Sequence, residues 1–210
     1  MHNGMLLVDG EKMSKSLGNF RTVQDILVLG PWAGEAFRLL LLKTHYRAAL
    51  DYTEAALAEA RKELDRFYRA LSKLADVDAE RGTEPHAVEQ PAVEQALADD
   101  LNTPLALASL HYLVSAVNEA LAAGDDAALP HLKGRILEAG ELLGILQQAP
   151  EAWFRAGVTL DAAAIEAAIA ARLAARKAKD WAEADRIRKE LAEQGILLED
   201  GPGGTTWRRA

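Results

Sequence analysis

The sequence predicts a mainly α-helical protein. We expect an antiparallel helical bundle, preceded by a strand-and-loop segment and followed by a small helix-plus-hairpin domain. Three observations support this. Apolar residues recur at three- and four-residue steps, as between Leu57 and Leu74. Short connections with helix start and stop signals separate such stretches. Near the end, two predicted strands, residues 196–199 and 205–207, flank a glycine-rich turn, which is typical of a hairpin.

Composition narrows the class of protein. Half of the 210 residues are hydrophobic, which is enough for a buried core. Because there is no run of about 18 apolar residues and no secretory signal at the N-terminus, we expect a cytoplasmic protein without a membrane partner. The chain has no cysteine, so its sequence excludes disulfides and cysteine-ligated zinc.

Charge is unevenly distributed along the chain. The formal net charge of −8 argues weakly against a general nucleic-acid binder, since phosphate contacts need Lys and Arg. Between residues 172 and 189, however, seven basic residues stand against three acidic ones, a local charge of +4. They are Arg172, Arg176, Lys177, Lys179, Arg186, Arg188 and Lys189 against Asp180, Glu183 and Asp185. Basic surface is therefore expected at the C-terminal end.

The first fifty residues combine a strand, a loop and two helices. Residues 5–8 are apolar and end at a turn signal, which predicts a short strand before the polar loop 11–20. Thr22 and Asp25 resemble a capping box and predict a helix that stops at residues 30–31. A buried helix is expected over 33–43.

Later elements follow from caps and breakers. A helix is expected after Thr53, and an exposed loop over 76–91. Thr103 is predicted as an N-cap, with Pro104 at the first helical position. We expect the helix that it starts to end at about residue 123, and another to span about 132–146.

A second break, over residues 149–159, predicts a domain boundary. A helix is expected after Asp161. Asp180 and Glu183 predict a capping-box start for the next helix, which ends at Gly195.

Lys12-Met13-Ser14-Lys15-Ser16 is the first candidate site. A lysine ammonium has three hydrogen-bond donors and suits a triphosphate, where charge builds on the leaving pyrophosphate. Small hydroxyl residues add donors and let the loop close over a nucleotide. A solvated lysine–serine turn is the alternative interpretation.

This loop matches, letter for letter, the signature loop of class I aminoacyl-tRNA synthetases. The flanking His2-Asn3-Gly4-Met5 and Leu17-Gly18-Asn19-Phe20 resemble the cysteinyl member, as does His45-Tyr46-Arg47 with Tyr52 after it. For His45 and Tyr46, packing at a helix end is an equal alternative.

The resemblance implies that residues 1–50 are the end of a Rossmann-type catalytic domain with a stem-contact region. It implies that Lys12 and Lys15 are catalytic, and that Lys12, Ser14, Lys15 and Ser16 bind ATP together with Mg.

The second candidate site lies in the basic C-terminal stretch. Single-stranded RNA is recognised by aromatic stacking and by hydrogen bonds to base edges. Trp181 stands at the first turn of a capped helix, with Arg176 nearby and Asp185 on the same helix face. Asp185, and Asp200 in the predicted hairpin turn, could accept hydrogen bonds from base amino groups. Alternatively Trp181 is a core residue, as Trp207 is expected to be, and Asp185 pairs with a lysine.

The stretch closely resembles the C-terminal anticodon-binding domain of bacterial cysteinyl-tRNA synthetases. The resemblance implies that residues 160–210 form this domain and that Arg176, Trp181, Asp185 and Asp200 bind the cysteine tRNA. It also implies that residues 51–149 are a helical-bundle anticodon-binding domain. In the family-like segment 99–104, Asn102 and Thr103 are interpreted as helix-start chemistry.

Two features of the family are missing. Neither its ATP-binding His-Ile-Gly-His-type motif nor its zinc site is present, and both belong to its N-terminal half. We therefore expect a fragment of the enzyme that is inactive alone, with zinc only in the missing half. Short solvated loops and an acidic surface predict a monomer. The resemblance implies that the full enzyme uses ATP and cysteine to charge the cysteine tRNA.

Three rival interpretations remain. A related cysteine ligase of thiol biosynthesis shares the loop but lacks the anticodon module, so residues 172–209 argue against it. A stand-alone tRNA-binding module would have no ligase activity. A helical interaction protein would have no affinity for tRNA.

Overall fold

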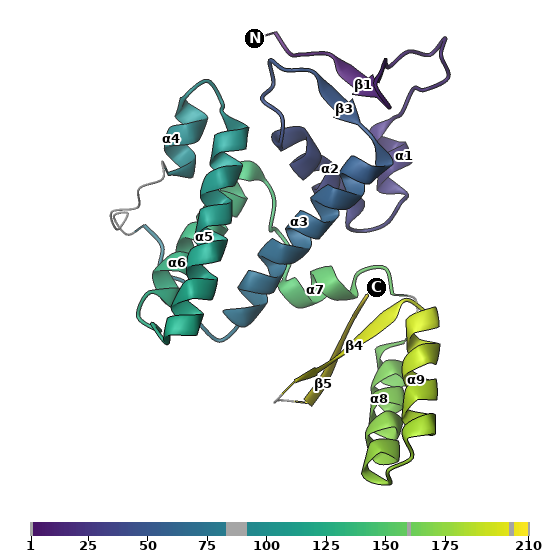
Figure 1. Ribbon diagram of the computed structural model, residues 1–210. Helices are drawn as coiled ribbons and strands as arrows, with labels where there is room; N and C mark the ends of the chain where they lie inside the picture. Colours follow the sequence, from purple (N-terminus) through teal and green to yellow (C-terminus); the bar gives the residue numbers. More distant parts are fainter. Residues whose placement is uncertain (1, 83–91, 159–160, 202–203, 210) are drawn as a thin grey trace. The chain divides into compact units, whose positions relative to one another are not determined.

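The computed structural model describes residues 2–82, 92–158, 161–201 and 204–209 (Figure 1). Contacts divide the chain into two compact units, Met1–Pro150 and Glu151–Ala210. The first unit contains both of the first two predicted domains, so the division near residue 50 stays a prediction. Part of the expected loop over 76–91, residues 83–91, lies outside the described residues.

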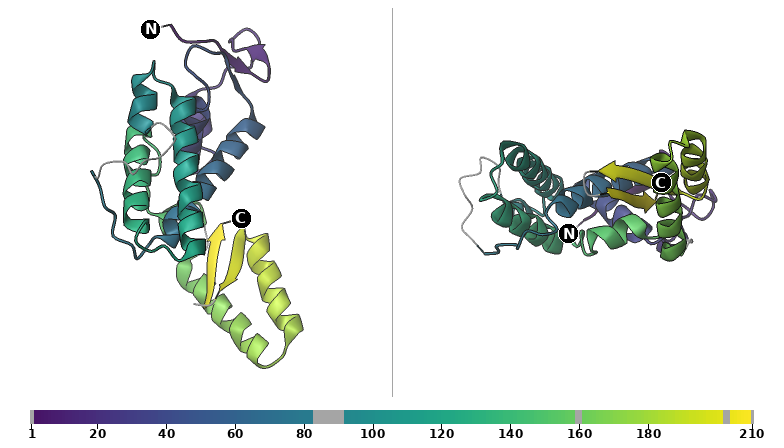
Figure 2. Two further views of the ribbon diagram at one scale, coloured as in Figure 1. Left: turned by 60° about the vertical axis from the view of Figure 1, so that its left-hand side comes forward. Right: turned by 90° about the horizontal axis from the view of Figure 1, so that it is seen from below.

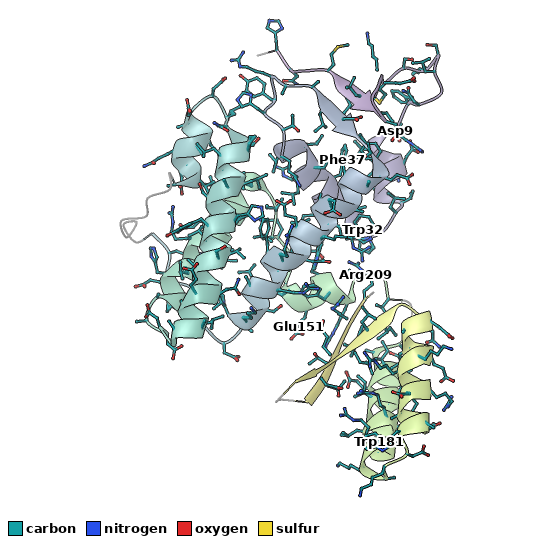
Figure 3. The ribbon with its side chains drawn as sticks, in the orientation of Figure 1. Asp9, Trp32, Phe37, Glu151, Trp181 and Arg209 are labelled. Carbon is teal, nitrogen blue, oxygen red and sulfur yellow. The ribbon has the colours of Figure 1, made fainter. Side chains whose placement is uncertain are left out.

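A small sheet opens the first unit. β1 (Leu6–Val8) is the central strand, with β2 (Glu11–Lys12) antiparallel on one side and β3 (Leu50–Tyr52) parallel on the other. The sequence predicted β1 but neither of its partners. Phe37, labelled in Figure 3, belongs to a helix, and its ring packs against that of Tyr52 in β3 with centroids 6.1 Å apart, which joins the sheet to the helices.

Among the residues that the structure describes, six helices follow this sheet in the first unit. They are α1 (Val23–Leu27), α2 (Ala33–Leu42), α3 (Glu54–Lys73), α4 (Val93–Ala98), α5 (Thr103–Ala123) and α6 (Leu129–Leu143). α2 packs on α3, and α5 packs against both α4 and α6 while also contacting α3; Figure 2 shows these helices from two further sides. The side chains that they bury completely include Leu39, Leu64, Phe67, Leu110 and Ile136.

Several predicted helix limits need correction. The N-cap of α5 is Asn102, not Thr103, because the Asn102 side chain accepts a hydrogen bond from the Leu105 amide at 3.2 Å. α6 runs three residues earlier than predicted and ends where Gly144 takes a left-handed φ of 67°. α4 was not predicted. The capping box of Thr22 and Asp25 is confirmed.

Within the described residues, α5 is long and apolar enough, by length and composition alone, to cross a membrane. The structure shows another reason for its apolar content. Leu110 and Val117 are fully buried against the neighbouring helices. Beside them on α5, His111 hydrogen-bonds the Glu63 carboxylate of α3 at 2.7 Å, and Asn118 accepts from Lys73 of α3 at 2.7 Å. α5 is therefore a core helix of the bundle.

The second unit pairs two helices with a hairpin. The boundary helix α7 (Pro150–Arg155) lies inside the predicted break, and α8 (Ala162–Lys177), α9 (Trp181–Glu193), β4 (Ile196–Gly201) and β5 (Gly204–Arg209) follow. Their core consists of Ile165, Ile169, Ile187, Leu191, Ile196 and Trp207. The Trp207 indole N–H donates to Glu166 at 3.1 Å, so its predicted core position is confirmed.

Candidate functional site

The lysine–serine loop follows the β1–β2 hairpin in the chain. Lys12 ends β2 opposite Leu7, and the Met13 amide donates to the Leu6 carbonyl at 3.4 Å. Asn19 closes the loop from its other end. Its Oδ1 accepts from the Ser14 amide at 2.8 Å, and its Nδ2 donates to the Lys12 carbonyl at 3.3 Å. The backbone between Lys12 and Asn19 is therefore shaped by its own contacts.

The lysine–serine loop presents exposed lysines together with serine hydroxyl groups, which are groups that can bind an anion. The Ser14 Oγ accepts from the Leu17 amide and lies 3.1 Å from the Ser16 Oγ. Lys12 and Lys15 are both exposed, and the Lys15 Nζ lies 5.6 Å from the Phe20 ring centroid. Among the described residues no carboxylate forms an ion pair with either lysine. Both ammonium groups can therefore bind phosphate oxygens.

Trp181 lies at the end of the α8–α9 hairpin with 60% of its surface exposed (Figure 3). This excludes the alternative that it is a core residue. The Asp180 side chain caps α9 by accepting from the Glu183 amide at 3.1 Å. The Glu183 carboxylate bonds Arg186, so the structure shows only this half of the predicted capping box.

The α8–α9 hairpin that carries Trp181 also carries exposed basic residues. On α9, Asp185 and Arg188 follow at helical spacing and are exposed, whereas Ala184 and Ile187 face the core. Four exposed basic residues of this hairpin form no ion pair within the described part of the chain: Lys177, Lys179, Arg188 and Lys189. An exposed indole beside unpaired cations fits a single-stranded nucleic acid.

Asp200 is bound within the protein. It lies in β4, opposite Thr205, and not in the hairpin turn as the sequence suggested. Arg172 donates to both of its carboxylate oxygens at 2.9 Å, while Arg176 adds a contact at 3.0 Å and the Thr205 hydroxyl another at 2.7 Å. The hydrogen bonds from Arg172, and then from Thr205, hold the pKa of Asp200 well below its usual range.

Because its carboxylate already accepts these four hydrogen bonds, Asp200 has little capacity to accept another from a nucleic-acid base. The structure therefore brings the predicted residues Arg176 and Asp200 together, and Arg172 joins them. Sequence reasoning missed the role of Arg172 because it counted that residue only as surface charge. Its spacing from Ile165 and Ile169 was a signal that it points inward, and Arg172 is 8% exposed.

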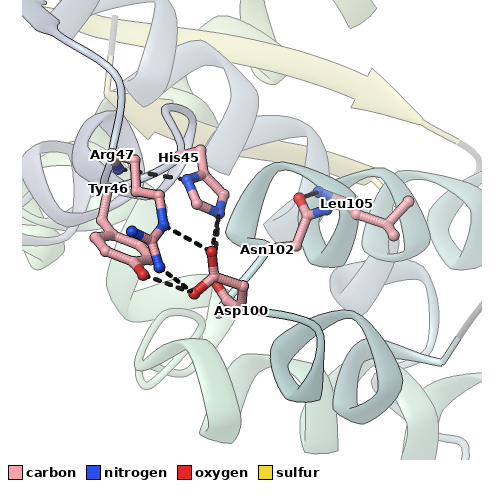
Figure 4. Close-up of polar contacts among 6 residues, drawn as sticks. All are labelled: His45, Tyr46, Arg47, Asp100, Asn102 and Leu105. Atoms are coloured by element: carbon pink, nitrogen blue, oxygen red, sulfur yellow. Dashed lines mark hydrogen bonds and ion pairs between the residues drawn. The ribbon is translucent and has the colours of Figure 1, made fainter. Parts of the chain in front are cut away.

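A polar cluster joins the turn after α2 to the link between α4 and α5 (Figure 4). Arg47 donates to the two Asp100 carboxylate oxygens at 2.7 and 3.0 Å, and the Tyr46 hydroxyl donates at 2.6 Å. His45 Nε2 lies 3.1 Å from the Asp100 carbonyl oxygen, and its ring stacks on Tyr46. Hydrogen bonds from Arg47 and then Tyr46 lower the pKa of Asp100 to about 2.

Zinc does not fit these residues. Within the described part of the chain, no group of three or more His, Cys, Asp or Glu side chains could hold a metal ion. The whole sequence also lacks cysteine, the ligand type expected for a thiol-sensing zinc site.

Three families match consecutive parts of the chain. Residues 1–62 match the class I (C) tRNA synthetase catalytic domain, and residues 92–147 match the DALR domain. Residues 162–208 match the cysteinyl-tRNA ligase anticodon binding domain. The first match contains the lysine–serine loop and the third contains Trp181.

Curated relatives match along the entire chain. The cysteine–tRNA ligase of Acidiphilium cryptum is 59% identical over 210 residues, and that of Granulibacter bethesdensis is 55% identical over 213. The enzyme of Paramagnetospirillum magneticum is 53% identical over 212 residues. The matches cover 100% of this chain but only 43%, 41% and 44% of these relatives. The chain therefore belongs to the class I cysteinyl-tRNA synthetase family and corresponds to the C-terminal portion of its members.

Proposed function

We propose that this chain provides the ATP loop and the tRNA-binding part of a cysteine–tRNA ligase, which activates cysteine with ATP and transfers it to the cysteine tRNA. Two observations support this proposal. The lysines of the signature loop are exposed and form no ion pair within the described residues, and the same chain matches the anticodon binding domain. The complete enzyme's activity is proposed from relatives that are more than twice as long as the matched region.

In this proposal Lys12 and Lys15 bind the triphosphate of ATP. Adenylate formation releases pyrophosphate, and negative charge grows on the leaving phosphates in the transition state. Two ammonium groups on one loop stabilise that charge, while Ser14 and Ser16 supply hydroxyl donors. Mg accompanies ATP by shielding the same phosphates. The contacts from Asn19 hold the loop's shape before the nucleotide arrives.

The second unit binds the cysteine tRNA at its anticodon. Trp181 stacks on an unpaired base, and the basic residues around it contact the phosphates. Asp185 accepts from a base amino group, which its exposed position on the Trp181 face allows. Asp200 of β4 and Arg176 of α8 act indirectly, because their ion pair holds the β4–β5 hairpin against α8. We assign them a positioning role in place of direct base contacts.

The described residues supply neither an ATP-binding histidine motif nor a zinc site, so we propose that the chain does not form cysteinyl adenylate alone. We propose a monomer that works in the cytoplasm. Cysteine-dependent ATP–pyrophosphate exchange catalysed by the purified chain would overturn the first statement.

A chimeric enzyme tests the proposal. The chain replaces the matching portion of the Acidiphilium cryptum ligase, and aminoacylation of cysteine tRNA is measured. We expect an active chimera whose pyrophosphate exchange falls about 100-fold with Lys15→Ala, the cost of losing one transition-state donor. A chimera that binds tRNA but never charges it would favour the second candidate, a stand-alone tRNA-binding module.

A further inference from the structure

The Asp100 carboxylate connects two parts of the first unit that are far apart in sequence. It lies in the link between α4 and α5, and its partners Tyr46 and Arg47 lie in the turn of residues 43–49 between α2 and β3 (Figure 4). Because Arg47 makes a two-point contact and Tyr46 adds a third bond, this cluster fixes the orientation of the turn.

The backbone of the same turn holds the start of the N-terminal strand. The Gly4 amide donates to the Tyr46 carbonyl at 2.6 Å, and the Leu50 amide donates to the Met5 carbonyl at 2.9 Å. A Cβ at Gly4 would lie 1.9 Å from the Ala48 carbonyl oxygen, so the two backbones touch there. A shift of the turn therefore moves the strand.

That strand carries the lysine–serine loop. β1 pairs with β3 on one side and with β2 on the other, and Lys12 is the last residue of β2. Direct contacts thus run from Asp100 through Tyr46 and Gly4 to β1, and from β1 to Lys12. Each step is a backbone or charge-assisted hydrogen bond.

The link around Asp100 has backbone bonds of its own. The Leu101 amide donates to the Leu97 carbonyl, and the Asn102 amide to the Ala96 carbonyl, both at 3.1 Å. The Asn102 side chain caps α5. These bonds close the α4–α5 link without the Asp100 side chain, whose hydrogen bonds and ion pairs within the described residues all go to the 45–47 turn.

From this geometry we propose that Asp100 is a positioning residue for the lysine–serine loop. Through Tyr46 and Arg47 it fixes the turn on which β1 rests, and so sets where Lys12 and Lys15 stand relative to the helical bundle. The proposal rests on the proposed function, because it assigns that loop to ATP. A structural role limited to the α4–α5 link is the competing explanation.

Regional hydrogen exchange in the 210-residue chain separates the two explanations. Asp100→Asn keeps a residue type that tolerates the left-handed φ of 53° and removes the charge. Arg47→Gln removes the same ion pair from the other side, and the matched control Asp99→Asn removes a neighbouring exposed charge. We expect Asp100→Asn and Arg47→Gln each to speed exchange of residues 4–12 at least about threefold.

In the same variants, exchange in the core of α5 should stay unchanged, and Asp99→Asn should resemble the wild type. A change confined to residues 96–106 would overturn the proposal in favour of the structural role. So would unchanged exchange over 4–12 in both variants. This readout uses no nucleotide, so it fails or succeeds separately from the proposed function.

MgATP binding to the same chain supplies the second readout. We expect Asp100→Asn to weaken MgATP binding severalfold while both lysines are intact, and Lys15→Ala to weaken it further. If Lys15→Ala weakens binding but Asp100→Asn does not, the positioning role is refuted. If Lys15→Ala has no effect, the ATP assignment of the loop fails, and the exchange result alone then decides whether Asp100 positions the loop.

Discussion

Glu63 offers the sharpest stability test, because it is a buried carboxylate with two partners. It is 5% exposed on α3, where it accepts from Lys43, the C-cap residue of α2, and bonds His111 of α5, each at 2.7 Å. Burial alone raises its pKa. The hydrogen bonds from His111 and Lys43 outweigh that effect and lower the pKa of Glu63 from 4.5 to about 2.

This shift translates into free energy of unfolding. A depressed carboxyl pKa stabilises the folded state above the unfolded value of 4.5, and the stabilisation is lost as pH falls toward about 2. At about 1.4 kcal/mol per pKa unit, the shift corresponds to about 3 kcal/mol at pH 7. Because Lys43 and His111 are partly exposed, solvent screening reduces the expected cost of Glu63→Gln to about 2 kcal/mol.

Denaturant-dependent hydrogen exchange in α3 and α5 measures this cost for the first unit separately from residues 151–210. We expect the free energy of unfolding of the wild type to exceed that of Glu63→Gln by about 2 kcal/mol at pH 7 and by clearly less at pH 3. Glu59→Gln, which removes an exposed carboxylate paired with Lys62 on the same helix, should cause no measurable change. A difference that is negligible at pH 7, or that does not shrink as pH falls, would refute the reasoning.

Three further predictions follow from single contacts. Gly134→Ala should destabilise the first unit by about 1–3 kcal/mol in the same exchange assay, because its Cβ would lie 1.8 Å from the Glu80 carbonyl oxygen; wild-type stability would contradict that contact. Arg172→Met should destabilise residues 151–210 by about 1–3 kcal/mol in thermal unfolding, since Asp200 loses its two-point partner, while Arg188→Met should not. Lys15→Ala should weaken MgATP binding measured by calorimetry and leave thermal stability unchanged; equal affinity would argue against the ATP loop.

Helix limits could be predicted where caps are visible in the sequence. α3 begins after Thr53, whose hydroxyl accepts from the Ala56 amide at 2.9 Å, and α5 ends at Gly124 with φ of 71°, as expected. The end of α6 was set three residues late, because the apolar pattern continues past Gly144. There the left-handed backbone and the close Arg38 side chain stop the helix.

Tertiary pairing could not be predicted from local signals. β3 has three residues, and its pairing partner β1 lies 44 residues earlier in register, so nothing in the local pattern indicates a strand. The contact between Asp200 and Arg172 spans 28 residues, so the local sequence did not predict it. The Asp100 cluster similarly joins residues more than 50 positions apart. The position of Trp181 at the start of a helix could be predicted, because the residues around it are polar and the helix cap lies next to it in sequence.

The central claim is that the surface around Trp181 reads the anticodon of the cysteine tRNA. The most direct test measures the affinity of the chain for this tRNA and for the same tRNA with a changed anticodon, at one salt concentration. Wild type is compared with Trp181→Ala and with Leu173→Ala, which trims an exposed apolar residue of α8. The account predicts a preference for the native anticodon, a loss of about 1–3 kcal/mol with Trp181→Ala, and little change with Leu173→Ala. Equal binding of both tRNAs, insensitive to Trp181, would contradict it.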